Sequence, residues 1–526
     1  MTMSASGLNP TGWRPEMGQG PDSGNGARAT FTGNRALQLE EPLLFEIGAM
    51  DRTGVDFAEE TNAPLDALTS HLRTAPIALP GLSEPEAVRH YTRLSRQNYA
   101  IDLGLFPLGS CTMKHNPRLD EKLARLPGFA DVHPLAPQQT VTGALEAIDQ
   151  LAHWLIALTG MHGVAMTPKA GAHGELCGLL CIRAALAARG DARSVVLVPE
   201  SAHGTNPATA AFAGYKVESI PATAAGRVDF AGLEARLGPD IAAVMITNPN
   251  TCGLFEPEMK RIADAVHAAG GFVYCDGANF NAIVGKVRPG DLGVDAMHIN
   301  LHKTFSTPHG GGGPGSGPVV LSEALSPFAP LPFVMRDNDG TVHLVEEADA
   351  AARGHSQAFG RMAAFHGQMG MFTRALTYIL SHGADGLRQV AEDAVLNANY
   401  VLRSLEDVLD APFAASGPCM HEALFSDAGF AGGLSTLDLA KGLIDEGYHP
   451  MTVYFPLVVH GAMLVEPTET ESKASLDQFI GAVRSLADRA KAGDETLKNA
   501  PYFAPRRRLD ETQAARKPRL VWTPPE

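Results

Sequence analysis

Cysteine is scarce in this sequence, and its spacing excludes several kinds of protein. The six cysteines among 526 residues are Cys111, Cys177, Cys181, Cys252, Cys275 and Cys419. Cys177 and Cys181 stand one helical turn apart, but no second pair and no histidine follows at the spacing of a zinc site. We therefore expect no metal, no disulfide framework and a reducing, cytoplasmic location.

Long apolar runs and clusters of basic residues are also missing. No apolar run is long enough to span a bilayer, and the N-terminus lacks the basic-then-apolar order of a signal peptide. The formal net charge is −16 and the acids are scattered, so neither a membrane nor a nucleic acid is expected as a partner. Residues 1–38 are rich in Gly, Pro, Ser and Asn, which predicts a disordered N-terminal extension.

Short apolar runs alternate with helical patterns in the middle of the chain. Runs at 194–198, 242–246, 272–275, 296–299 and 319–321 predict strands, and 257–270 predicts a helix with proline at its start and glycine at its end. Such alternation favours a largely parallel sheet covered on both faces. Long helices are predicted at 363–380 and 384–408. The sequence therefore predicts an α/β protein, with a large mostly parallel-sheet domain and a smaller α+β C-terminal domain.

Lys303 stands in a setting that ordinary packing does not explain. It follows an apolar strand-like run at 294–299, and a glycine tract begins at Gly310. Glycines let backbone approach a ligand closely. A lysine partly shielded from water is favoured in its neutral, nucleophilic form, which is the chemistry of a Schiff-base lysine. The alternative is a surface lysine on a flexible loop.

Three other segments supply what a pyridoxal phosphate site needs. Asp276 ends the strand at 272–275 and could pair with a pyridinium nitrogen, or could cap the next element. Ala170, Gly171 and Ala172 lead into a helix, whose N-terminus suits a phosphate; a plain loop-to-helix junction would look the same. His203 follows the strand at 194–198 among polar residues, and could lie flat on a cofactor ring, although most lone histidines do not.

Six motifs in order give the chain a family resemblance. They are residues 106–114 (FPLGSCTMK), 170–175 (AGAHGE), 201–207 (SAHGTNP), 276–279 (DGAN), 300–305 (NLHKTF) and 465–472 (VEPTETES). The chain resembles glycine dehydrogenase (decarboxylating), the P-protein of the glycine cleavage system, and specifically its second subunit. That subunit is similar in fold to aspartate aminotransferase, so the resemblance implies a pyridoxal-phosphate-dependent transferase of fold type I.

The resemblance also implies roles for individual residues. Lys303 would hold pyridoxal 5'-phosphate through its amine, Asp276 would pair with the ring nitrogen, and His203 would stack on the ring. The backbone of Ala170, Gly171 and Ala172 would cradle the phosphate. Asn248 would approach the phenolic oxygen of the ring, and Ala278 and Thr304 would complete the cofactor site.

The substrate side of the site is predicted less directly. Ser110, Cys111, Thr112 and Lys114 are candidates for binding glycine, although a structural loop explains them equally well. Lys303 is the leading proton shuttle, with His302, His309, His366, His421 and His460 as further candidates. Glu466 and the run at 469–471 could line a pocket or cap the helix that follows, and the sequence favours the cap.

The resemblance implies an activity and partners. The enzyme would decarboxylate glycine, release CO₂ and transfer the aminomethyl group to the lipoyl arm of the H-protein. A first subunit would complete an α₂β₂ heterotetramer. Residues 39–125 would pack on the large domain (126–345) and on the partner subunit, with a small domain at 346–500 and a C-terminal tail at 501–526.

Two other functions are compatible with parts of the sequence. The first is another reaction of the same fold type, such as an aminotransferase or a cysteine desulfurase. An aminotransferase needs an arginine for the substrate carboxylate, and Arg353, Arg361 and Arg374 are available. The second is a non-catalytic partner subunit, which would be expected to lack a lysine such as Lys303.

Overall fold

The computed structural model describes residues 41–49, 52, 54, 66–75, 79–133, 136–309, 315–504, 506–521 and 523. The predicted disordered extension at 1–38 and most of the glycine tract, at 310–314, lie outside the described residues. The chain forms two compact units. Unit 2 comprises 105–440 and 449–494, and unit 1 comprises the described parts of 1–104 with 441–448 and 495–526.

Unit 2 contains a seven-stranded sheet in the order β1-β7-β6-β5-β4-β2-β3. The strands are β1 (Gly163–Ala165), β2 (Val195–Pro199), β3 (Lys216–Ile220), β4 (Ile241–Thr247), β5 (Phe272–Asp276), β6 (Ala296–His298) and β7 (Val319–Leu321). The pairs from β6 to β3 are parallel, while β7 runs antiparallel to both its neighbours. The five predicted strands are confirmed within one or two residues.

Two strands of the sheet were not predicted, β1 and β3. β3 lies at the edge of the sheet, and only its last residue is fully buried. An edge strand can expose polar side chains such as Lys216 and Glu218, so it does not appear as an apolar run. β1 has only three residues, of which Ala165 alone is buried.

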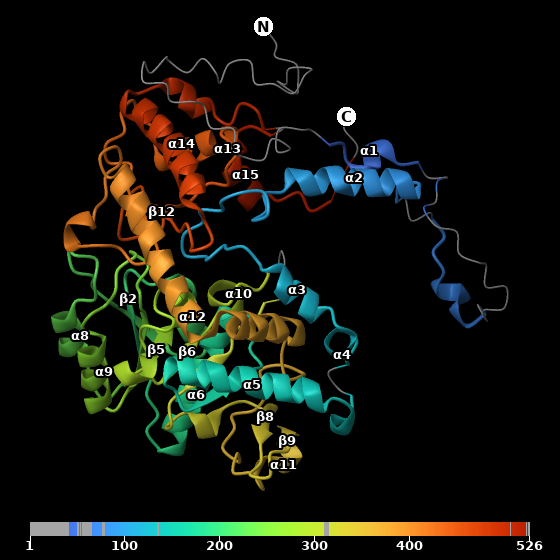
Figure 1. Ribbon diagram of the computed structural model, residues 1–526, viewed down its shortest axis with the longest axis vertical. Coiled ribbons are helices and arrows are strands. Elements are labelled where there is room, and N and C mark those ends of the chain that lie inside the picture. The colour runs from blue at the N-terminus through green and yellow to red at the C-terminus, as the bar shows by residue number, and fades with distance from the viewer. Residues whose placement is uncertain are drawn as a thin grey trace. The chain divides into compact units, whose positions relative to one another are not determined.

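Both faces of the sheet are covered by helices, as predicted (Figure 1). Side chains alternate along each strand: Val195 and Leu197 belong to one core, Val196 and Val198 to the other. The first core includes α5 (Thr142–Thr159), α8 (Phe230–Arg236), α9 (Met259–Ala268) and α12 (Met369–Leu405). The second includes α6 (Gly171–Ala188) and α7 (Thr205–Phe212). A buried parallel sheet of this kind fixes the positions of its strand ends.

A second, antiparallel sheet has the order β10-β12-β11, with β10 (Ala423–Phe425), β12 (Met463–Val465) and β11 (Thr452–Val453). The two helices predicted at 363–380 and 384–408 are one element, α12, interrupted at Gly383, where φ is 63° and ψ is −174°. The other elements of unit 2 are α3 (Arg118–Ala124), α4 (Pro127–Ala130), α10 (Leu301–Thr304), β8 (Phe333–Arg336), β9 (Val342–Val345), α11 (Glu347–Ala350) and α14 (Lys473–Lys491); α13 (Thr436–Asp445) begins there.

Unit 1 contains the short helices α1 (Leu44–Ile47) and α15 (Glu511–Arg516) and the longer α2 (Glu84–Gln97). α2 begins with a capping box, in which Glu86 accepts the Ser83 N–H over 2.9 Å. Asp445 accepts the backbone N–H groups of Tyr502, at 2.8 Å, and Phe503, at 3.0 Å. These bonds hold the segment after residue 495 to the strip at 441–448.

The predicted domain bounds at 39–125, 126–345, 346–500 and 501–526 stay a prediction. No helix in the described part of the chain combines the length and the apolar character that a membrane crossing requires.

Candidate active site

Four predicted site residues stand where neighbouring parallel strands end. Asp276 is the last residue of β5, Asn248 follows β4, His203 lies just beyond β2, and Lys303 lies in α10 after β6. The strands β6, β5, β4 and β2 are neighbours in that order. Because the carboxyl ends of parallel strands face one edge of the sheet, the four groups share the place where such sheets bind ligands.

Asp276 is buried and well supplied with partners. Asn206 Nδ2 donates to its Oδ2 over 3.0 Å, and the Ala278 N–H donates to its Oδ1 over 2.9 Å. His298 Nε2 lies 3.3 Å from the same Oδ1. Burial alone would raise the pKa of Asp276, but His298, the two donors and the Lys303 ammonium together lower it below its ordinary value. Asp276 is therefore ionised at neutral pH and can pair with a protonated ring nitrogen.

His298 is a site residue that sequence reasoning missed. Its Nδ1 lies 2.6 Å from the Tyr274 hydroxyl, and its Nε2 lies 3.0 Å from Asn300 Oδ1. In the sequence, the sign of this role is a histidine inside the apolar run at 296–299, where the pattern predicts only a strand. His298 orients Asp276 and ties β6 to β5.

Lys303 is half-buried, and its Nζ donates to the carbonyl oxygen of Ser110 over 2.9 Å. Ser110 has a left-handed backbone, with φ of 60°, and its N–H donates to Glu422 Oε1. Burial raises the pKa of the adjacent Cys111 thiol, and Lys303 opposes that rise. The structure thus brings Ser110 and Cys111, two of the predicted substrate residues, to the lysine.

His203 is held at the rim of the site. Its Nδ1 lies 2.8 Å from Thr205 Oγ1, and that hydroxyl donates to Glu175 Oε1 over 2.8 Å. Burial raises the pKa of Glu175, and the nearby Asp276 adds to the rise. The exposed His203 ring meets Phe455 edge-on, with centroids 5.6 Å apart. The ring is thus exposed to solvent and does not stack in parallel on Phe455.

The start of α6 offers hydrogen-bond donors and a close approach to backbone. Ala170 is its N-cap residue, and no side chain caps the helix. A Cβ on Gly171 would lie 2.8 Å from Asn300 Nδ2, so a side chain here would have to displace the Asn300 amide. The hydroxyls of Thr304 and Ser316 are buried and have no hydrogen-bond partner among the described residues. Gly317, next to Ser316, donates to Pro168 O over 3.0 Å, which brings this hydroxyl near the helix start. Helix N–H groups and free hydroxyls suit a phosphate, and Ser316 is a donor that the sequence did not reveal.

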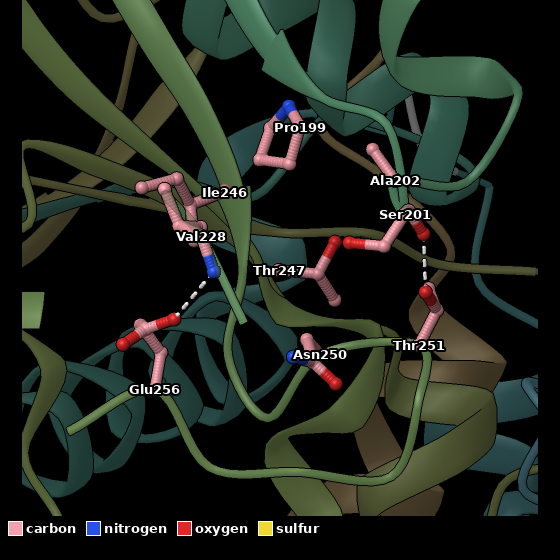
Figure 2. A pocket seen from close by; sticks show the side chains of 9 residues that line it. All are labelled: Pro199, Ser201, Ala202, Val228, Ile246, Thr247, Asn250, Thr251 and Glu256. Atoms are coloured by element: carbon pink, nitrogen blue, oxygen red, sulfur yellow. Dashed lines mark hydrogen bonds between the residues drawn. The ribbon is translucent and has the colours of Figure 1, made fainter. Parts of the chain in front are cut away.

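Asn248 is buried, and its amide is already engaged. Its Oδ1 accepts the Glu256 N–H over 3.0 Å, and its Nδ2 donates to the Glu256 carbonyl over 3.3 Å. Beside it, a small hollow opens between the ends of β2 and β4; it is lined by Pro199, Ser201, Ala202, Val228, Ile246, Thr247, Asn250, Thr251 and Glu256 (Figure 2). The role of Asn248 at a cofactor oxygen stays a prediction.

Comparisons with known proteins decide the family. A family model described as "Glycine dehydrogenase, C-terminal domain" matches residues 390–502, and one described as "Aminotransferase class-V" matches 178–313. The chain is 66% identical to the "Probable glycine dehydrogenase (decarboxylating) subunit 2" of Caulobacter vibrioides, over 97% of each chain. The chain belongs to the glycine dehydrogenase (decarboxylating) subunit 2 family. The namesake from Listeria innocua is 48% identical over 92% of this chain and 99% of its own.

Solved structures agree on the fold of this chain. A glycine decarboxylase (P-protein) of the glycine cleavage system, in inhibitor-bound form, is 21% identical, with a TM-score of 0.66 over 80% of this chain and 94% of that one. A glutamate decarboxylase from Lactobacillus brevis is 12% identical, with a TM-score of 0.60 over 81% and 98%. The predicted family, fold class, enzyme class and pyridoxal phosphate cofactor are confirmed.

Lys114 lies in a buried polar cluster and is only 3% exposed. Its Nζ donates to Glu469 Oε1 over 2.7 Å, to Asn281 Oδ1 over 2.8 Å and to the Thr304 carbonyl over 2.8 Å, and it lies 3.3 Å from the Tyr378 hydroxyl. An ammonium group has three N–H donors, and the three nearest partners use all of them. The assignment of Lys114 as a substrate residue stays a prediction. A stability measurement can distinguish a substrate role from a structural one.

The preferred interpretation of the glutamates as helix caps is wrong for two of them. α14 is capped by Ser472, whose side chain accepts the Ser475 N–H. Glu466 is fully buried, and Glu469 pairs with Lys114. Only Glu471 touches the helix start, where it accepts the Ser475 hydroxyl over 2.7 Å.

The candidate histidines are spread over different environments. The side chain of His460 is fully exposed, whereas His421 is fully buried beside Glu422 and Glu466. His302 and His309 lie next to each other, with ring centroids 5.0 Å apart. Burial lowers the pKa of His302 to about 3, so it is neutral at physiological pH. The choice of proton shuttle among them stays a prediction.

The crowded glycine at the start of α6 yields a first testable prediction. Gly171→Ala should weaken binding of pyridoxal phosphate about tenfold, a loss of ~1.4 kcal/mol, because the added Cβ would displace Asn300 at the start of α6. Titration of the apoprotein, followed by absorbance, measures this. Gly143→Ala in α5 is the matched control, because a Cβ there would contact nothing within 4 Å. Equal affinities of the two variants would contradict the phosphate assignment.

Proposed function

We propose that this chain binds pyridoxal phosphate at the carboxyl edge of β6, β5, β4 and β2 and decarboxylates glycine there. The aminomethyl group passes to the lipoyl arm of the H-protein, and CO₂ is released. The observation that carries the proposal is that a half-buried Lys303 and a buried, ionised Asp276 follow adjacent strands of the sheet in a member of this family.

The residues present fit the cofactor. Lys303 would hold it through Nζ, Asp276 would receive its ring nitrogen, and His203 would cover the ring face. Ala170, Gly171 and Ala172, with the unpartnered hydroxyls of Thr304 and Ser316, would bind the phosphate, and Ala278 would hold Asp276 from the backbone. When bound, pyridoxal phosphate supplies a sink for the electrons that the departing carboxylate leaves behind.

The protein's own contribution is orientation and proton transfer. The Ser110 carbonyl fixes Lys303 Nζ at 2.9 Å, so the amine, once free, is held where it can take or return a proton. Ser110, Cys111 and Thr112 would form the glycine side of the pocket. Glycine has no side chain to bind, so the site must hold its carboxylate with the breaking bond perpendicular to the ring.

The charged network disfavours an aminotransferase. The three arginines available for a substrate carboxylate are all paired: Arg353 Nη1 with Asp337 at 2.7 Å, Arg361 with Glu346 and Glu347, and Arg374 Nε with Glu121 at 2.7 Å. A carboxylate substrate would have to displace an existing partner from each of them. This supports decarboxylation over amino-group transfer.

Partners are proposed from the family name. Relatives are called subunit 2, which implies a companion subunit. We propose an α₂β₂ assembly with that companion, with the lipoylated H-protein as the second partner. The cytoplasmic location predicted from the cysteine content stays a prediction.

Exchange of labelled bicarbonate into the carboxyl group of glycine tests the function. With lipoylated H-protein and the companion subunit present, we expect glycine to become labelled. The chain without its companion should show almost no exchange, because the site would be incomplete. Transfer of the glycine amino group to a keto acid, without bicarbonate exchange, would point instead to an aminotransferase. Full exchange by the chain alone would refute the need for a companion.

A further inference from the structure

Two glutamates stand opposite each other on adjacent strands of the small antiparallel sheet. β10 and β12 pair with Ala423 opposite Val465. One step further along this register, Glu422 stands opposite Glu466, and both are 0% exposed. Side chains directly opposite on antiparallel strands lie about 5 Å apart, and like charges there repel. The fold therefore places two carboxyl groups close together where solvent does not reach them.

The surroundings do not satisfy two ionised carboxylates. Glu422 Oε2 and both carboxyl oxygens of Glu466 make no well-aligned hydrogen bond within the part of the chain that the structure describes; the groups near enough to interact are the Thr112 hydroxyl, for Glu466, and the other carboxyl group of the pair. Leaving a buried charge without partners is costly. A single proton removes the conflict, because a protonated carboxyl group can donate to the other one. Burial raises the pKa of Glu422 to about 7, and burial together with Glu422 raises that of Glu466 well above its ordinary value.

The pair is connected to Lys303 through one residue. The Ser110 N–H donates to Glu422 Oε1, and the Ser110 carbonyl accepts from Lys303 Nζ. The left-handed backbone of Ser110 directs these two groups. The Lys303 charge also acts on both carboxyl groups, which shows that it lies within electrostatic reach of them.

We propose that Glu422 and Glu466 hold one proton between them, and that the single negative charge left on the pair is the counter-charge of Lys303. The pair acts on Nζ through Ser110 and through the electric field, so both glutamates are positioning residues. This role rests on the proposed function, since it concerns the lysine that would hold the cofactor.

A metal ion is the other way to neutralise such a cluster. His421, Glu422 and Glu466 bring ligand atoms within 4.8 Å of one another. However, His421 Nε2 lies 3.9 Å from Glu466 Oε1, wider than the roughly 3.4 Å between two tetrahedral ligands at zinc. Glu422 already accepts the Ser110 N–H, and the Lys303 charge would repel a cation. The geometry therefore favours the proton.

Other titratable groups near the pair are few. The charged and ionisable side chains that interact with it are Lys303, Lys114, Glu469, Cys111, Cys252 and Cys419. His421 stays neutral, because burial, with a smaller effect of Lys303, lowers its pKa to about 3. Burial raises the pKa of Cys252 and of Cys419 to about 12. Lys114 and Glu469 form their own ion pair over 2.7 Å, so the carboxyl pair and Lys303 are the charges left to balance each other.

Infrared spectroscopy of the apoprotein tests the shared proton without any catalysis. At pH 8 the wild type should show the carbonyl stretch of a protonated carboxyl group, and Glu466→Gln should lose one equivalent of it. Asp120, whose pKa burial raises to about 7, is mostly ionised at pH 8, and the small signal that it keeps is the same in both proteins. Glu471→Gln, a half-buried carboxyl variant away from Lys303, should leave the band unchanged. A wild-type spectrum that matches the spectrum of Glu466→Gln would overturn the proposal. Elemental analysis that finds a stoichiometric metal in the wild type, but not in Glu466→Gln, would overturn it as well.

Stability provides a second readout with a definite sign. The folded pKa of Glu422, about 7, exceeds the ordinary 4.5. Between these values the folded chain binds more protons than the unfolded chain, so stability falls as pH rises through this window. The Glu422→Gln variant lacks this loss of stability. The difference in melting temperature, variant minus wild type, should therefore be larger at pH 8 than at pH 5. No difference between the two pH values would count against the proposal.

The counter-charge is tested on the holoenzyme. The double variant Glu422→Gln/Glu466→Gln removes the charge of the pair but keeps its shape. The pH midpoint of the visible absorption of the bound cofactor should then move about one unit toward acid, which is a tenfold change in proton affinity. Glu466→Gln keeps one carboxylate and should shift the midpoint by less than about a third of that. In the exchange assay the double variant should lose kcat about tenfold, with KM for glycine nearly unchanged. Equal midpoints in all three proteins would overturn the counter-charge. Failure of the decarboxylation proposal would instead abolish exchange in the wild type and leave the infrared result intact.

Discussion

Lys303→Ala should abolish the visible absorption of bound pyridoxal phosphate and lower bicarbonate exchange by roughly three orders of magnitude or more. The amine is the group that would hold the cofactor and return a proton, and no other described lysine hydrogen-bonds to Ser110. The variant should still fold, because Lys303 Nζ makes one described hydrogen bond, to the Ser110 carbonyl. Absorbance of the purified protein, far-ultraviolet circular dichroism and the exchange assay measure the three outcomes.

Two controls make the Lys303 result specific. Lys286→Ala removes a surface lysine that pairs with Glu392, and it should keep both colour and activity. In the wild type, borohydride reduction followed by peptide mass spectrometry should place the cofactor on the peptide that contains Lys303. An adduct on Lys114 or Lys169, or a colourless wild type with cofactor added, would refute the assignment of the site.

Lys114→Met should destabilise the folded chain by about 3–5 kcal/mol. Methionine keeps the volume of the side chain but leaves Glu469 as an unpaired buried charge, and it removes the donor to Asn281 and to the Thr304 carbonyl. Adding Glu469→Gln should restore much of the loss, because the uncompensated charge disappears. Urea unfolding of the three proteins measures this coupling.

The same variant separates a structural from a substrate role for Lys114. The exposed Lys122 in α3 is the matched control, and Lys122→Met should change stability by less than about 0.5 kcal/mol. If Lys114 instead bound the glycine carboxylate, Lys114→Met would raise KM for glycine while unfolding stayed close to that of the control. A loss of stability under about 1 kcal/mol with a large rise in KM would therefore favour the substrate role.

The parts of the site that sequence reasoning found share a local signature. Asp276 ends a buried apolar run, and Lys303 follows one, so each marks a strand end without any knowledge of the fold. In a parallel sheet such ends meet at one edge, and the prediction of a common site followed from that rule. The motif resemblance then supplied the family, which the comparisons confirm.

The parts that it missed depend on contacts between distant segments. His298 looked like a strand residue, and only the pairing of β5 with β6 places it against Asp276. Glu466 looked like a helix cap, since nothing near it in sequence shows that it is buried opposite Glu422. Lys114 looked equally suited to a substrate, because its partner Glu469 lies far along the chain.

The sequence by itself determined the alternation of strands and helices, the strand-end lysine and aspartate, and the family, because each is written in local periodicity or in contiguous motifs. Only the tertiary structure decided which buried charges face one another. Strand register and the packing of segments hundreds of residues apart set those distances, and burial then changes the charge that each group carries. The carboxyl pair next to Lys303 is a product of that register, in which one step beyond Ala423 and Val465 brings two glutamates together away from water.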